Sequence, residues 1–196
     1  MLRLSGLLVI AGINAAAACP QQLPESGLRL TRTADGYSAV YKKTSAGLVE
    51  ERVMTRDGKQ EKVTTIYLHP LVTGQRISSK GTLSLEYSKS LSNVDSVKQS
   101  GQWLSDFVLK YNANEVDRGV ARLSYLDEGQ VEIGKCSYDV WRIESRLELE
   151  GRAAPTTFDR YYSPKLGLVL RAIKLTPDRE TINGVVFDNI EVVEPN

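Results

Sequence analysis

The sequence is poor in the residues that most often carry chemistry. Its 196 residues include only two cysteines and one histidine. A zinc site needs three or four His, Cys or carboxylate ligands at close spacing, and two cysteines cannot staple a small disulfide scaffold. A glycine-rich phosphate loop is also missing. We therefore expect neither a metal site nor another cofactor.

A surplus of one charge is absent as well. The chain has 25 Lys and Arg residues against 24 Asp and Glu residues. Nucleic-acid binding and attachment to an anionic membrane surface both need an excess of basic side chains, so we expect neither. No run of eighteen or more residues is apolar enough for a transmembrane helix, and we expect no membrane span.

Few residues are candidates for catalysis. The single histidine, His69, would have to serve any Ser-His-Asp triad, but no Gly-x-Ser-x-Gly sequence presents a nucleophile. Pro70 follows it, and proline stops a strand ladder, so we interpret His69 as a polar residue at a strand end. Glu50 and Glu51 are neighbours, which point to opposite faces of a strand and cannot form an acid/base pair. We predict no catalytic residue and a protein that is not an enzyme.

Residues 1–18 have the layout of a secretory signal peptide. Arg3 supplies a basic start, residues 4–13 are mostly apolar, and four alanines precede Cys19. Small residues at this point suit a signal peptidase. We expect cleavage between Ala18 and Cys19, which leaves residues 19–196 as one exported domain.

The sequence leaves three alternatives for Cys19. In one, Cys19 is the acylated first residue of a bacterial lipoprotein, because it directly follows a signal-like segment that ends in alanines. Acylation of Cys19 would anchor the protein to a membrane. Alternatively, Cys19 and Cys136 form the one disulfide that two cysteines allow in an oxidising compartment. Two unpaired thiols are the third alternative.

From Gly27 onward the sequence is typical of antiparallel strands. Segments with two-residue alternation are separated by turn residues such as Asp-Gly and Asn-Gly. In residues 138–150, Trp141, Ile143 and Leu147 share one parity, and charged residues fill the other. Tyr138 and Val140 fall on the charged side, so we expect that end to be covered on both faces. The expected strands are 28–33, 37–43, 48–56, 60–68, 81–88, 103–112, 116–126, 130–133, 138–150, 156–163, 168–175 and 185–193.

About a dozen strands in one domain must protect their edges from aggregation. We therefore predict an all-β fold: a single curled antiparallel sheet, half-barrel or barrel-like, with a β-sandwich as the alternative. Residues 90–101 interrupt the alternation and predict a short helix over 93–98, or a lid, that stops at Gly101. Trp103, Phe107, Trp141 and Leu147 are expected on the concave side, either as packed core or as the lining of an apolar ligand pocket.

Two segments carry a resemblance. Residues 134–143 (GKCSYDVWRI) and 160–171 (RYYSPKLGLVLR) resemble a pattern found in uncharacterised exported proteins of Gram-negative bacteria. The resemblance extends back to Cys19 and Pro20. It implies a periplasmic β-rich fold of unknown function, with Cys136 bridged to an N-terminal cysteine, and supplies no active site.

These observations predict a non-enzymatic periplasmic protein. Its curled sheet would bind an apolar, lipid-like ligand or a component of the cell envelope. The alternative is an interaction module that scaffolds envelope proteins, and an enzyme is the third hypothesis.

Overall fold

The structure, a computed structural model, describes residues 18–56 and 58–194. The expected signal peptide lies outside the described residues, except for Ala18. The elements are β1 Leu28–Arg32, 3-10 helix η1 Thr33–Asp35, β2 Tyr37–Thr44, β3 Gly47–Arg56, β4 Lys59–His69, β5 Val72–Ser78, β6 Gly81–Tyr87, 3-10 helix η2 Leu91–Asn93, α1 Val97–Ser100, β7 Gln102–Tyr111, β8 Asn114–Ile133, β9 Cys136–Leu149, β10 Thr156–Ser163, β11 Leu168–Leu175, β12 Thr181–Val186 and β13 Asn189–Val192.

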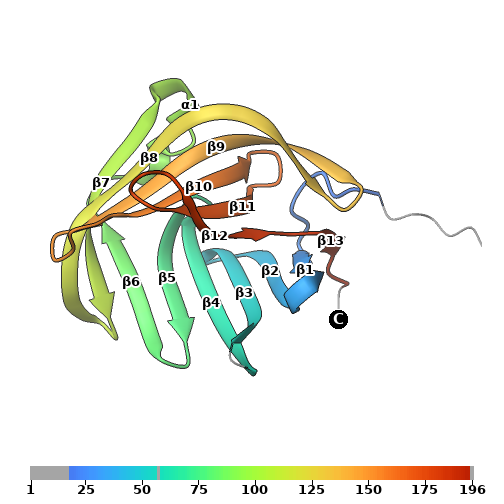
Figure 1. The fold of residues 1–196 in the computed structure, drawn as a ribbon, viewed down its shortest axis with the longest axis horizontal. Helices are drawn as coiled ribbons and strands as arrows, with labels where there is room; N and C mark the ends of the chain where they lie inside the picture. Colours follow the sequence, from blue (N-terminus) through green and yellow to red (C-terminus); the bar gives the residue numbers. More distant parts are fainter. Residues whose placement is uncertain (1–17, 57, 195–196) are drawn as a thin grey trace, which may run out of the picture.

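All the strands belong to one antiparallel sheet of 13 strands (Figure 1). Consecutive strands pair from β1 to β12, and β13 returns to pair with β1. The two edges, β12 and β13, are thus consecutive in the chain. Three Cα steps join Val186 to Asn189, at most about 11 Å, whereas a flat sheet of this many strands would be about 58 Å wide. The sheet must therefore curl until its edges meet, which confirms the predicted single curled sheet over the sandwich.

The meeting edges form a seam, which is held by individual contacts and not by a strand ladder. Arg32 Nη1 donates a hydrogen bond to Gly184 O at 2.9 Å, across from β1 to β12. The Thr33 amide and hydroxyl each donate to the Asp188 carboxylate at 2.8 Å. The sheet is curled but not closed by backbone pairing.

Two strands were missed by the sequence analysis, β5 and β12. The strand expected at 185–193 spans the end of β12 and all of β13, which Phe187 and Asp188 separate. Strand β5 includes Gly74, where a Cβ would lie 2.7 Å from Leu68 Cγ. The Leu68 side chain on β4 thus occupies the place of a β5 side chain. Because the glycine leaves no side chain to continue the alternation, the pattern that marks the other strands is absent from β5.

Two predicted turns lie within strands. Residues 127–129 belong to β8, where a bulge between Tyr125 and Asp127 absorbs one residue and pairing with β9 continues. Asn183 and Gly184 belong to β12, which pairs with β11. A Cβ on Gly184 would lie 2.5 Å from Ile173 Cδ1, so this glycine permits close packing and does not form a hairpin turn.

The long hairpin β8–β9 merges the strands expected at 116–126 and 130–133 into β8, and pairs β8 with the strand expected at 138–150. Gly134, with a φ of 57°, lies in its two-residue turn. Along β9 the buried side chains are first Tyr138 and Val140, then Ile143 and Ser145. Because neighbours in a strand point to opposite faces, β9 buries one face near its start and the other face farther along, which explains why apolar residues occupy both parities of this segment.

Two hydrophobic clusters fill the ends of the curl. The first cluster joins β1, β2 and β13 to the turn end of β8–β9 and to β11, and includes Leu28, Ile133 and Leu168. The second cluster joins β7, β8 and β9 to the start of β5 and to the 90–101 segment. Val94 and Val97 of that segment are completely buried in it.

The 90–101 segment is helical, as expected, but the helix starts later. Helix α1 begins at Val97, after η2, and not at residue 93. Gly101 ends it in the left-handed conformation with a φ of 78°, as predicted. The segment packs its two valines into the second cluster and so covers one end of the curl.

Candidate functional site

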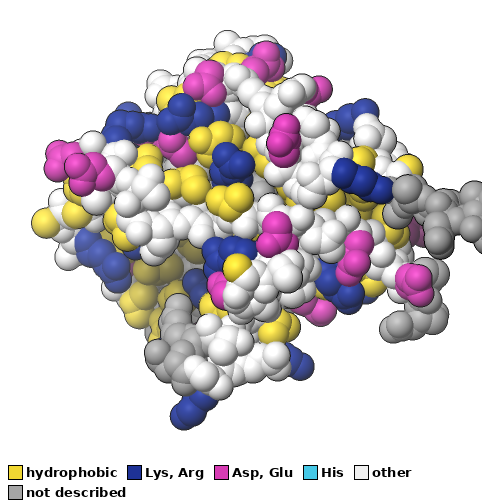
Figure 2. Space-filling model, turned by 45° about the vertical axis from the view of Figure 1, so that its right-hand side comes forward, with side chains coloured by type: hydrophobic (Ala, Val, Ile, Leu, Met, Phe, Trp, Pro, Cys, Tyr) yellow, Lys and Arg dark blue, Asp and Glu magenta, His cyan; other side chains and the backbone are white. Residues whose placement is uncertain are grey.

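The curl forms a cavity of about 520 Å³ that is open to solvent on one side. Its volume is within the range of about 300 to 1,000 Å³ typical of small-molecule sites. Strands β2–β5 line one side and β10–β12 the other. Figure 2 shows one face of the molecule, which is hollowed, with hydrophobic side chains in the hollow and Lys or Arg side chains beside them. The lining residues fall into three groups, an aromatic and apolar wall, one carboxylate and several arginines.

Three tyrosines from the first half of the chain line the cavity, Tyr37, Tyr41 and Tyr67. Burial raises the pKa of Tyr37 to about 12. Burial, together with the nearby Glu50 carboxylate, raises the pKa of Tyr41 and Tyr67 well above its ordinary value. The phenols are therefore neutral at physiological pH and bring no negative charge to the cavity.

The carboxylate of this wall is Glu50, which is completely buried. Arg52 donates to both of its oxygen atoms, at 2.8 and 2.9 Å, and Tyr67 Oη donates at 2.5 Å. Glu51 is exposed, which confirms that the two neighbours point to opposite faces. Because Arg52 neutralises it, Glu50 does not give the cavity a negative charge.

Five arginines line the cavity: Arg32, Arg52, Arg76, Arg160 and Arg171. Arg32 is paired with Asp35 at 2.5 Å and holds the seam, and Arg52 is paired with Glu50. Arg160 Nη1 donates to Leu71 O at 2.9 Å, which joins β10 to the β4–β5 turn across the curl. Burial lowers the pKa of Arg160, because its charge is partly removed from water.

The aromatic residues singled out from the sequence lie elsewhere. Trp103 and Phe107 are buried members of the second cluster, and Trp141 and Leu147 pack against it. The rings of Trp103 and Phe107 lie 5.8 and 6.0 Å from the ring of Tyr87. Trp103 and Phe107 are therefore core, one of the two roles expected of them, and Trp141 and Leu147 are partly buried at its border. Trp141 also lines a separate open cavity of about 690 Å³, with Tyr138 and Lys165. Other residues line the cavity between β2–β5 and β10–β12.

Cys19 and Cys136 form a disulfide, with their Cα atoms 5.5 Å apart. This distance is typical of the bond. The disulfide occupies the Cys19 sulfur that an acyl thioether would need. Of the three alternatives for Cys19, the structure contains the disulfide.

His69 lies at the end of β4, as expected. Its Nδ1 accepts a hydrogen bond from the Leu71 amide at 3.1 Å, and its Nε2 lies 3.1 Å from Asp95 Oδ1. Burial lowers the His69 pKa, while Asp95 opposes this shift. Nδ1 thus fixes the β4–β5 turn, and Nε2 joins that turn to the 90–101 segment.

Within residues 18–56 and 58–194, no group of three or more His, Cys, Asp or Glu side chains is placed to hold a metal ion. In the same ranges no helix has the length and apolar character needed to cross a membrane. Comparison of the chain with protein-family models, with curated proteins and with solved structures finds no match.

Sequence reasoning missed the arginines of the cavity. A signal was present in 168–175, LVLRAIKL, where Arg171 interrupts an apolar strand. A buried cation is costly without a partner, so an arginine at such a position indicates either a paired charge or a site. The sequence could not show which strands face Arg171, because that depends on the curl.

Proposed function

We propose that this protein is a periplasmic binding protein, not an enzyme, that holds a small amphiphilic ligand in the cavity of its curled sheet. The observation that carries the proposal is the cavity of about 520 Å³ whose lining combines apolar and aromatic side chains with arginines. An amphiphile matches such a wall, because its apolar part would cover Phe158, Val169 and Val185 and its polar part would contact the charged groups.

Two observations support the periplasmic part of the proposal. The signal-like residues 1–18 predict it, and the Cys19–Cys136 disulfide is compatible with an oxidising compartment. The resemblance to exported proteins of Gram-negative bacteria stays a prediction.

The binding site can be tested by filling it. Val185 lines the cavity, whereas Val186, the next residue of β12, is 41% exposed. Val185→Trp would place an indole in the cavity, and Val186→Trp would place the same group on the opposite face of the strand. The probe is the uncharged dye N-phenyl-1-naphthylamine, whose fluorescence rises in apolar surroundings.

We expect the wild type and Val186→Trp to bind the dye with similar affinity, and Val185→Trp to bind it at least about tenfold more weakly. Native mass spectrometry of the protein purified from a Gram-negative periplasm should show an adduct that denaturation removes. Dye binding that survives Val185→Trp unchanged would overturn the proposal.

A further inference from the structure

The arginines of the cavity differ in whether a carboxylate accompanies them. Arg32 has Asp35 and Arg52 has Glu50. Arg76, Arg160 and Arg171 also line the cavity, and within the described part of the chain no carboxylate lies within ion-pair distance of them. The cavity wall therefore carries positive charge that the protein itself does not neutralise.

Two arginines outside the cavity, Arg142 and Arg179, share a buried carboxylate. Asp159, which is 4% exposed, accepts from Arg142 at 2.6 Å and from Arg179 at 3.1 Å. Arg142 and Arg179 thus have a carboxylate partner, as Arg32 and Arg52 do, whereas Arg76, Arg160 and Arg171 of the cavity have none within ion-pair distance among the described residues.

Arg171 has an additional unsatisfied group. Its Nε is buried and has no hydrogen-bond partner among the described residues, and its guanidinium carbon lies 5.2 Å from the centroid of the Tyr161 ring. A buried donor without a partner is rare, because it loses its hydrogen bonds to water. The Tyr161 ring restricts the guanidinium, so its free donors are already oriented.

Arg160 uses one of its two terminal nitrogens for a hydrogen bond within the described part of the protein. Nη1 donates to Leu71 O, and the Phe158 ring lies 5.8 Å from the guanidinium carbon. A guanidinium has five N–H donors, so most of those on Arg160 remain for another acceptor. Burial lowers its pKa, and the Glu50 carboxylate, which is bound by Arg52, opposes this shift without reversing it.

We propose that Arg76, Arg160 and Arg171 bind the anionic headgroup, a phosphate or carboxylate, of the ligand held in the cavity. The three arginines come from β5, β10 and β11, on facing sides of the curl, and can approach one anion from both sides. Guanidinium groups suit this role because their paired donors match the oxygen atoms of a carboxylate or phosphate. This inference rests on the proposed function and specifies the ligand class.

The test compares four ligands by calorimetric titration: decyl phosphate, decanoate, decanol and inorganic phosphate. The first three share one apolar chain and differ in headgroup charge. We expect decyl phosphate and decanoate to bind at least about tenfold more tightly than decanol. Inorganic phosphate distinguishes a headgroup from a free anion. If it binds as tightly as decyl phosphate, the arginine site is supported and the ligand is a free anion.

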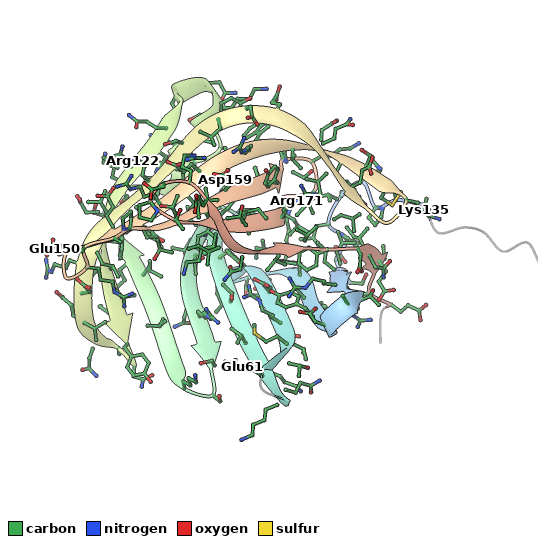
Figure 3. All side chains as sticks on the ribbon, viewed as in Figure 1. Glu61, Arg122, Lys135, Glu150, Asp159 and Arg171 are labelled. Atoms are coloured by element: carbon green, nitrogen blue, oxygen red, sulfur yellow. A yellow bond between two sulfur atoms is a disulfide. The ribbon has the colours of Figure 1, made fainter. Side chains whose placement is uncertain are left out.

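Arg171→Gln should weaken binding of decyl phosphate about 10- to 100-fold, because it removes hydrogen bonds made by a charged group. Arg171→Lys keeps the charge but loses the paired donors, and we expect an intermediate affinity. The matched control is Arg122→Gln, which removes the same charge from an exposed position on β8. Figure 3 labels both residues, Arg171 toward the middle of the molecule and Arg122 toward one side.

Decanol shows whether the variants keep the cavity intact. Its affinity should be the same in wild type, Arg171→Gln and Arg122→Gln. Equal affinities of decanol and decyl phosphate, or an equal loss of decyl phosphate binding in Arg171→Gln and Arg122→Gln, would overturn the arginine site and leave the proposed function standing. Failure of every ligand and of the uncharged dye to bind would instead overturn the proposed function.

Discussion

The two hydrophobic clusters belong to one sheet but are assembled differently. The second cluster comes mostly from consecutive strands and the helical segment between them, including Val97, Trp103 and Leu123. The first cluster brings together both ends of the chain, as in the pairing of Leu30 with Ile190. Local hairpins can form the second cluster, whereas the first depends on contacts between distant residues, which cost more chain entropy to form.

A disulfide stabilises the first cluster, whose contacts join distant parts of the chain. Cys136 belongs to it, Cys19 packs against it, and their disulfide joins the N-terminal segment to the β8–β9 hairpin. The seam contacts of Arg32 and Thr33 lie at the C-terminal end of β1, a strand of the first cluster. The disulfide and the seam contacts therefore both lie in the region whose contacts join distant parts of the chain.

The two regions also differ in how they are filled. The second cluster is packed by buried rings such as Phe107, which is 3% exposed. The cavity beside the first cluster is lined by partly buried rings such as Phe158, and by arginines. Guanidinium groups cannot pack as densely into an apolar core without losing their hydration, so the arginines keep the cavity open to a polar occupant.

Removing the disulfide should have the largest effect on stability. The double variant Cys19→Ser/Cys136→Ser lacks the cross-link between residues 117 positions apart. We expect its free energy of unfolding to fall by about 4 to 5 kcal/mol, because the unfolded chain gains entropy. Urea unfolding of the variant and the wild type measures this difference.

Hydrogen exchange on the same variant tests whether the loss is local. Amides of β1 and β13 should lose more protection than amides of β7, because the disulfide fastens the first cluster and not the second. Equal loss of protection in β1 and β7 would show that the two clusters do not differ in this way.

The packed and open regions can be compared with one substitution in each. Phe107→Ala should lower the free energy of unfolding by about 3 to 5 kcal/mol, since it leaves a void in the second cluster. Phe158→Ala should cost less than about 1 kcal/mol, because this ring faces the cavity. Urea midpoints measure both, and similar losses would mean that the cavity wall is as tightly packed as the cluster.

Breaking the ion pair of the cavity should lower the free energy of unfolding by a smaller amount. Glu50→Gln leaves the Arg52 charge without its carboxylate and should cost about 2 to 3 kcal/mol. This value is below the range of about 3 to 5 kcal/mol for a fully buried pair, because the Arg52 side chain is 21% exposed and keeps part of its hydration. Glu51→Gln, on the exposed face of the same strand, is the control and should change stability by less than about 0.5 kcal/mol. Equal effects of the two substitutions would argue against a buried charge at Glu50.

Much of the fold could be predicted from local patterns. Alternation located most strands, Gly101 ended the helix as expected, and two cysteines allowed only one intramolecular pairing. The errors occurred where packing overrides a local signal. Asn183 and Gly184 resemble a hairpin turn in sequence, but Gly184 lies inside β12 and pairs with Ile173 of β11. A glycine fits at this position because the Ile173 side chain occupies the space that a Cβ would need.

The candidate site was much less predictable. The sequence analysis placed Trp103 and Trp141 on the concave side without deciding between core and pocket, and the structure places Trp103 in the second cluster and Trp141 against it. It did not identify Arg160 or Arg171 as cavity residues. An arginine in a strand has the same sequence pattern whether it faces solvent, a carboxylate or a cavity.

The sequence by itself determined the antiparallel meander, because two-residue alternation decides which side chains share a face and the turn residues decide where the chain reverses. Tertiary structure alone decided that β13 returns to β1, that the curl forms a cavity, and that arginines from opposite strands face it. The physical reason is that curvature accumulates from small rotations between many neighbouring strands. Whether a sheet face meets itself is therefore a property of the whole sheet and of no single segment.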